Sequence, residues 1–287
     1  MHREKKDLSR QDVPLGWKNG IMKRQLNIDE IRSIQLDILQ SIHTFCVEND
    51  LRYSLAFGTL LGAIRHKGYI PWDDDLDIMM PRPDYERFIN EYPGYNKRYT
   101  LQTYKNDGSY FLSLAKVYDN RTEQIIFPTK TGVFVDIFPI EGLPDTEEEA
   151  EQYMKQYTKL IFHDILYTCK NNAYRPGNKL FNAIKYLAKR IMYPSRQSGI
   201  RKLDELRKKY PFEKTSHAGY AIIETMMKGY MEKKVFERYT LIPFEGKEYY
   251  AIADYDTFLK MRYGDYMQLP PEEERVPGHA APVYWKE

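Results

Sequence analysis

The sequence is poor in cysteine, and this scarcity limits the kind of protein it can encode. Its 287 residues contain two cysteines, Cys46 and Cys169, and no C-x-x-C pair. A disulfide framework and a cysteine-rich zinc site are therefore excluded, and a reducing compartment is expected. No run approaches the roughly 18 apolar residues that a membrane-spanning helix needs. No apolar segment follows the polar N-terminus either. We expect a cytoplasmic protein, either soluble or peripheral at the inner face of the membrane.

A large net charge is also missing, but the charges are segregated along the chain. The formal net charge is +2. Residues 170–209 nevertheless contain twelve Lys or Arg residues against two acids, whereas residues 139–151 are acidic. The basic segment lacks glycine-aromatic RNA motifs, so we expect no nucleic-acid partner.

The chain has enough apolar side chains to form a substantial core. Hydrophobic residues make up 42% of it, which argues against disorder. Its 25 tyrosines are an excess. Because tyrosine is amphipathic, they indicate either a partly solvated surface or interface, or a site for a sugar or a quaternary amine.

Hydrophobic periodicity predicts a mixed α and β architecture of the α+β class. Ile31, Ile34, Ile38, Ile42 and Phe45 recur at helical spacing behind a plausible cap, Asn27. We expect helices over residues 27–50, 60–65, 83–91 and 146–167, and strands over residues 52–57, 76–80, 111–118 and 132–138.

These elements divide the chain into three parts. Residues 1–25 are polar and predict a flexible arm. Residues 26–145 form the expected catalytic core. Residues 146–287 are a helical, basic and aromatic-rich half that completes the same domain and contributes the acceptor side.

A cluster of aspartates carries the most chemical information. Asp75 and Asp77 are two apart on an expected strand, so their side chains leave the same face. Like charges this close repel unless a cation lies between them. Oxygen ligands of this kind suit Mg²⁺ or Mn²⁺ held together with substrate phosphates. Asp136, in an apolar strand, would complete a three-carboxylate metal and catalytic site.

Other residues around the acids favour phosphate binding. Gly58 and Thr59 stand where a strand turns into a helix, and glycine lets the backbone approach an anion. Lys116 and Arg121 could supply cations to the phosphates. Each signal has a plain alternative: Asp73–Asp75 could form a solvated turn, and Lys116 could be an exposed strand cation.

The same residues resemble a known family. The runs over residues 58–65 and 70–77 are similar to the signature of LicD-type phosphocholine transferases, which are related to the fukutin-related enzymes that transfer ribitol phosphate. Further matches occupy residues 134–139, 242–247, 263–267 and 270–273. The tail after them has one histidine, His279, where a histidine-rich tail is expected.

The resemblance implies a nucleotidyltransferase-fold core, a divalent metal and a CDP-linked donor such as CDP-choline. It places the metal carboxylates on Asp75, Asp77 and Asp136. The expected acceptor is a sugar hydroxyl of a surface glycan such as teichoic acid or lipopolysaccharide, either free or lipid-linked, and CMP is released. Trp72 and some tyrosines could cage the choline. Nucleotidyl transfer with release of pyrophosphate, or a non-catalytic glycan or membrane scaffold, remain alternatives.

One further segment predicts where the protein works. Residues 179–192 form an apolar stripe edged by Lys185, Lys189 and Arg190. Such a helix can lie on an anionic membrane, or it can pack on the domain as an ordinary amphipathic helix.

Overall fold

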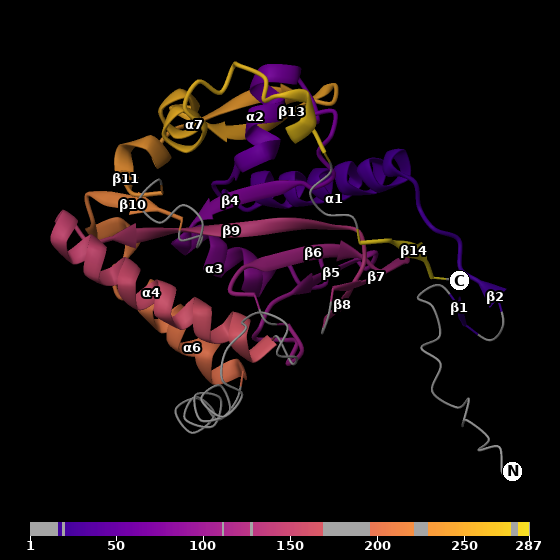
Figure 1. Cartoon of the computed structure of the whole chain (residues 1–287), viewed down its shortest axis with the longest axis horizontal. Helices are drawn as coiled ribbons and strands as arrows, with labels where there is room; N and C mark the ends of the chain where they lie inside the picture. The colour runs from indigo at the N-terminus through magenta and orange to yellow at the C-terminus, as the bar shows by residue number, and fades with distance from the viewer. Residues whose placement is uncertain are drawn as a thin grey trace, which may run out of the picture.

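The computed structural model describes residues 17–18, 21–110, 112–126, 129–168, 196–220, 229–276 and 281–286. Its centre is a seven-stranded mixed sheet built around one long strand, β9 (Figure 1). β9 pairs in parallel with β4, which pairs antiparallel with β3. On β9, the first residues also pair with β6 and the last residues with β10. The sheet strands are β3 (Ser54–Leu55), β4 (Asp77–Pro81), β5 (Tyr99–Gln102), β6 (Ala115–Asp119), β9 (Phe134–Leu143), β10 (His217–Gly219) and β11 (Met231–Glu232).

Helices and small sheets surround this central sheet. The smaller strands are β1 (Trp17–Lys18), β2 (Ile21–Met22), β7 (Thr122–Ile126), β8 (Thr129–Thr131), β12 (Tyr239–Phe244), β13 (Lys247–Ile252) and β14 (Tyr284–Trp285). The α-helices are α1 (Ile28–Glu48), α2 (Phe57–His66), α3 (Arg82–Glu91), α4 (Glu147–Thr168), α6 (Arg196–Arg207) and α7 (Tyr255–Tyr263). Short 3₁₀ turns cover Phe212–Lys214, Lys233–Phe236 and Glu272–Glu274. The α+β class predicted from the sequence is confirmed.

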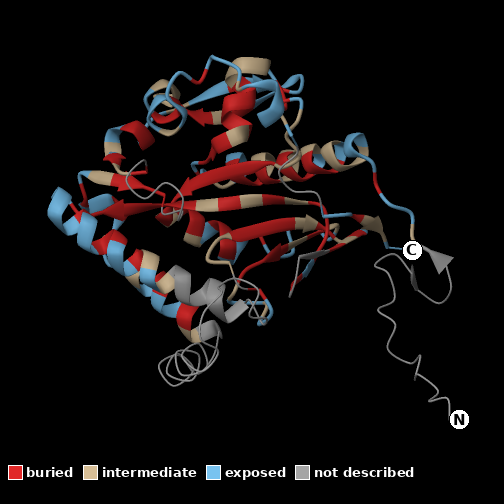
Figure 2. Ribbon diagram, viewed as in Figure 1, coloured by how far each residue is buried: buried red, intermediate tan, exposed pale blue. Residues whose placement is uncertain are grey.

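Helix α1 forms where its cap and its apolar stripe predict it. The Asn27 side chain accepts a hydrogen bond from the Glu30 N–H, and the Glu30 side chain accepts one from the Asn27 N–H. This capping box satisfies two N–H groups that a helix start leaves without partners. Ile38 and Ile42 are completely buried against the sheet. The core therefore lies between α1 and the central strands, which Figure 2 shows as buried along most of their length.

The last residues of the segment expected to be a flexible arm are attached to the rest of the protein. Lys23 forms an ion pair with Glu123, and Gln25 bridges to Tyr284. The two ends of the described chain thus lie next to each other (Figure 1). Residues 1–16 and the amphipathic segment 179–192 lie outside the described residues.

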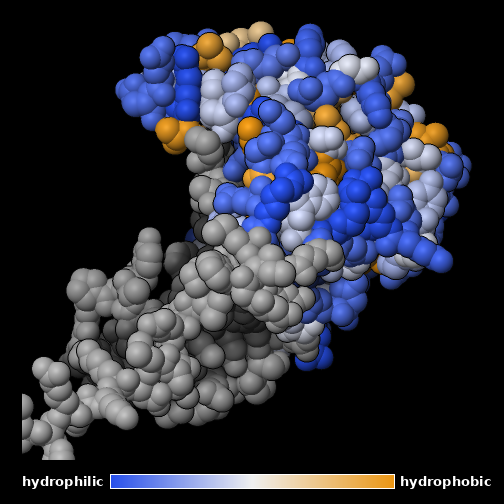
Figure 3. Space-filling model, turned by 90° about the vertical axis from the view of Figure 1, so that its right-hand side faces the viewer, coloured by the Kyte–Doolittle hydropathy of each residue, from blue (hydrophilic) through white to orange (hydrophobic). Residues whose placement is uncertain are grey.

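Within the described part of the chain, no helix combines the length and the apolar content needed to cross a membrane. The side of the molecule drawn in Figure 3 is mostly hydrophilic where it is coloured, and its hydrophobic residues form small separate spots.

Candidate active site

Three of the predicted site residues form a row across neighbouring strands. In the parallel pairing of β4 with β9, Asp77 lies directly opposite Asp136. In the antiparallel pairing of β9 with β6, Asp136 lies directly opposite Lys116. Directly opposite residues have neighbouring side chains on one face of a sheet. The structure therefore brings Asp77, Asp136 and Lys116 together across β4, β9 and β6, which are neighbouring strands of the central sheet (Figure 1).

The carboxyl group of Asp77 is buried among like charges. Asp77 is only 8% exposed. Burial raises its pKa well above the ordinary value, and the negative charges of Asp75 and Asp136 raise it further. The positive charge of Lys116 offsets only part of this effect. The folded chain therefore disfavours the ionised form of Asp77.

Lys116 is part of this site and not a surface residue. It is 4% exposed, so the alternative interpretation as an exposed strand cation is wrong. Its Nζ lies 2.6 Å from Oδ1 of Asp136 and 3.4 Å from the ring centroid of Phe134. A buried ammonium with a carboxylate on one side and an aromatic face on the other is held at a fixed position.

Asp75 reaches the site from a different element than the sequence predicted. The strand begins at Asp77, so Asp75 belongs to the irregular segment before it and the two acids do not share a strand. The ladder with β9 starts only at Asp77, which explains why the extended pairing does not include Asp75. A turn over residues 70–73 precedes the acids, because the Asp73 N–H donates to the Ile70 carbonyl at 2.9 Å. It is not the turn over Asp73–Asp75 that the sequence offered as an alternative.

The start of α2 positions two of the acids. Phe57 adopts a positive φ of 46°, which a non-glycine residue rarely does, and the chain turns there from β3 into α2. A Cβ atom on Gly58 would lie 2.5 Å from Oδ2 of Asp73, so only glycine allows this close approach. The Thr59 hydroxyl accepts a hydrogen bond of 2.9 Å from the backbone N–H of Asp77. Contact of Gly58 and Thr59 with phosphate stays a prediction.

Arg121 and Trp72 make their contacts elsewhere. The Arg121 guanidinium binds Asp119 at 2.8 Å and lies over the Trp285 ring. The Trp72 ring packs edge-on against His66, and the Arg275 guanidinium lies 5.6 Å from its centroid. The roles expected for Arg121 toward the donor phosphates and for Trp72 toward choline stay predictions, and these contacts do not favour them.

The chemistry of the acids fits a hard divalent cation. Asp77 experiences the charges of Asp73, Asp75 and Asp136, and a cation between such oxygens would relieve the repulsion. In the part of the chain that the structure describes, no three His, Cys, Asp or Glu side chains already converge as a metal site. Asp136 is instead bound to Lys116.

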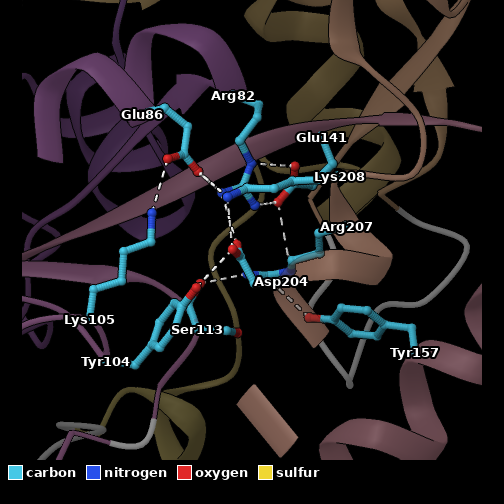
Figure 4. Close-up of polar contacts among 10 residues, drawn as sticks. All are labelled: Arg82, Glu86, Tyr104, Lys105, Ser113, Glu141, Tyr157, Asp204, Arg207 and Lys208. Carbon is cyan, nitrogen blue, oxygen red and sulfur yellow. Dashed lines mark hydrogen bonds and ion pairs between the residues drawn. The ribbon is translucent and has the colours of Figure 1, made fainter. Parts of the chain in front are cut away.

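A second ionic cluster, which no pattern in the sequence predicts, lies at the other end of β9 (Figure 4). Glu141 is completely buried there and binds Arg82 through both carboxylate oxygens. Arg82 also contacts Asp204 at 3.3 Å, and Arg207 donates to the Tyr157 hydroxyl at 2.9 Å. These contacts join α3, β9, α4 and α6. Their partners are far apart in the sequence, so no spacing rule could have found them.

The chain is similar to proteins of one family over most of its length. Residues 50–174 match the family described as LicD/FKTN/FKRP, nucleotidyltransferase domain. The lipopolysaccharide cholinephosphotransferase LicD of Haemophilus influenzae is 32% identical over 267 residues, which cover 91% of this chain and 99% of that protein. An uncharacterized protein of Rickettsia typhi is 35% identical over 26% of this chain and 24% of its own length. The match to the Haemophilus protein is nearly end to end, and the family match spans the stretch that contains β4 and β9. The chain therefore belongs to the LicD family and is a phosphotransferase enzyme.

Proposed function

We propose that this enzyme transfers phosphocholine from CDP-choline to a sugar hydroxyl of a cell-surface glycan and releases CMP. The name of the Haemophilus relative supports phosphocholine as the group and lipopolysaccharide as one acceptor. Teichoic acid is a second acceptor of the same chemical class.

The single observation that carries the proposal is the row of Asp77, Asp136 and Lys116 with Asp75 beside it. A diphosphate donor needs its charge neutralised and its phosphorus aligned with the incoming hydroxyl. Buried carboxylates with an adjacent ammonium offer both metal ligands and a cation for phosphate.

The transfer breaks one phosphorus–oxygen bond and forms another. The acceptor hydroxyl oxygen attacks the phosphorus that carries choline, and the bond to the bridging oxygen breaks, so that CMP leaves with the electron pair. We assign the hydroxyl proton to the carboxylate of Asp136. Phosphate and carboxylate compete for the same ammonium, so donor binding would draw Lys116 from Asp136 and leave this carboxylate to accept the proton.

We assign Mg²⁺ or Mn²⁺ to the oxygens of Asp75 and Asp77, with Asp136 as the third ligand. A divalent ion there supplies charge neutralisation for the phosphates. Thr59 holds the backbone of Asp77 through its hydroxyl, and Gly58 leaves room for the Asp73 carboxylate.

Product analysis tests the reaction directly. Purified protein is incubated with CDP-choline, Mg²⁺ and a glycan acceptor, and the nucleotide product is identified by chromatography and mass spectrometry. CMP together with a phosphocholine-modified glycan supports the proposal. Nucleoside triphosphate consumption with release of pyrophosphate would instead establish nucleotidyl transfer. No turnover of either donor, with glycan still bound by an Asp77→Asn variant, would establish a binding protein.

A lipid-linked acceptor would bring the enzyme to the inner face of the membrane as a peripheral protein. Sedimentation with anionic liposomes at low and high salt tests this. Salt-sensitive binding that is lost when Lys185, Lys189 and Arg190 are changed to Glu supports it. Absence of pelleting at every salt concentration contradicts it.

A further inference from the structure

A small cavity lies beside the acids, where the two ends of the described chain meet. It has a volume of about 190 Å³ and is bounded by the start of α1, the acidic segment before β4, the start of β9 and the C-terminal segment before β14. Figure 1 shows these elements converging on one side of the sheet. Cavities that enclose drug-sized ligands measure roughly 300–1,000 Å³. A whole nucleotide therefore does not fit, whereas a small headgroup does.

The C-terminal segment forms one wall of this cavity and is firmly attached. The Val283 carbonyl accepts a hydrogen bond of 2.9 Å from the Leu26 N–H. The Gln124 side-chain amide donates to the Ala281 carbonyl at 2.9 Å. Because Val283 is 4% exposed and Leu26 is equally buried, the wall is a packed surface and not a loose tail.

The lining combines negative charge with apolar surface. Asp74 and Asp75 face the cavity, together with Ile31, Phe134 and Val283. Among its lining residues, all within the described ranges, there is no Lys or Arg. A phosphate would be repelled there, and a strongly hydrated ammonium would lose water against the apolar walls. A quaternary ammonium is a cation with an apolar surface, which suits carboxylates, an aromatic ring and aliphatic side chains together.

We propose that this cavity binds the quaternary ammonium group of the phospho-alcohol, an inference that rests on the proposed function. Phe134 connects the two places, because it lines the cavity and its ring centroid lies 3.4 Å from Nζ of Lys116, which pairs with Asp136. A headgroup in the cavity therefore leaves its phosphate next to the row of Asp77 and Asp136. Phe134 contributes the aromatic wall in place of Trp72, which is not among the lining residues.

Ile28 offers a sharp test because it lines the cavity and is 41% exposed, so the fold tolerates changes there. Ile28→Lys adds a cation to the cavity, and Ile28→Gln is a neutral control of similar length. We expect Ile28→Lys to raise the KM for CDP-choline about tenfold, equivalent to about 1.4 kcal/mol. The KM for CDP-glycerol should stay unchanged, because this donor has no quaternary ammonium group. Asp74→Asn should act in the same direction. Asp29→Asn, which removes an acid facing a separate groove, should not.

Direct binding separates this inference from the proposed reaction. Phosphocholine is titrated into each variant, and its N-methyl protons are followed by NMR. Binding that weakens in Ile28→Lys and Asp74→Asn but not in their controls supports the cavity, even if no transfer of phosphocholine is found. Phosphocholine transfer by the wild type with equal binding and equal KM in all four variants overturns the cavity and leaves the proposed function intact.

Discussion

The two ends of strand β9 carry charged clusters that are built in opposite ways. Near its start, Asp136 stands beside Asp77, whose pKa is raised by burial and by neighbouring carboxylates. Near its end, Glu141 is enclosed by Arg82 and Arg207 (Figure 4). There, the hydrogen bond from Lys208 and the charge of Arg82 outweigh burial and hold the pKa of Asp204 below its ordinary value.

This difference indicates that the cluster at the start of β9 serves function and that the cluster at its end serves stability. A balanced buried network is destabilised by the loss of any member, because the partner is left charged and desolvated. A site crowded with like charges is relieved when one charge is removed. Residues with strongly shifted pKa values that oppose folding are therefore better functional candidates than residues that are merely buried and charged.

The largest expected effect is on activity at the start of β9. Asp77→Asn, like Asp75→Asn, should lower the transfer rate at least about 100-fold, because a carboxylate that neutralises and orients the reacting groups is lost. Steady-state kinetics with CMP detection measure it, and circular dichroism confirms the fold. Near-normal turnover by either variant would remove these acids from the mechanism.

The next largest effect concerns stability at the other end of the strand. Glu141→Gln should lower the free energy of unfolding by about 3–5 kcal/mol, because Arg82 loses its buried charge partner. Urea denaturation measures the change. Turnover per folded molecule should stay unchanged, since Glu141 lies outside the row of Asp77 and Asp136. A loss of turnover with unchanged stability would reverse the assignment of the two clusters.

A third prediction links Asp77 to pH. Its raised pKa means that the folded state binds a proton more tightly than the unfolded state, so stability falls as pH rises from the unfolded pKa toward the folded pKa. In metal-free buffer, Asp77→Asn should therefore melt at a higher temperature than the wild type at neutral pH, and the difference should shrink near pH 4. Each kcal/mol corresponds to roughly 2–4 °C in a protein of similar size. A lower melting temperature at neutral pH would contradict it.

The smallest effect is expected at the rim of the balanced network. Lys208 binds Glu86 and Asp204, but its side chain is 40% exposed. Lys208→Ala should cost only about 0.2–1 kcal/mol, as exposed ion pairs do, and the cost should shrink in high salt. Urea denaturation at two salt concentrations measures both. A cost equal to that of Glu141→Gln would mean that a residue's contribution to the free energy of unfolding does not depend on how deeply it is buried in this network.

Local patterns in the sequence predicted the local structure well. Helix α1 follows its cap at Asn27 and its apolar stripe, because both act within a few residues. The expected strand over residues 52–57 is reduced to Ser54–Leu55, since the chain turns at Phe57 into α2. No hydrophobic pattern reveals that a phenylalanine will adopt a positive φ.

The sequence predicted a contact between distant residues only where an acid in an apolar strand needed a partner or a metal. Asp136 drew attention as an acid in an apolar strand, and the register places it opposite Asp77. Glu141 lies in the same apolar run, but Arg82 and Arg207 reach it from separate helices. Which cation meets which acid is decided by the packing of α3 and α6, and neither helix encodes that in its own spacing.

The attachment of Val283 to Leu26 also has a consequence for how the protein is made. This contact joins residues that are far apart in the sequence, so Val283 leaves the ribosome long after Leu26. Contacts between such distant residues raise the contact order and slow folding, because a long loop must close first. A growing chain already contains Asp77 and Asp136 long before Val283 emerges. The wall of the small cavity is thus assembled after the acids, and a chain cut short before Val283 would carry the acids without it.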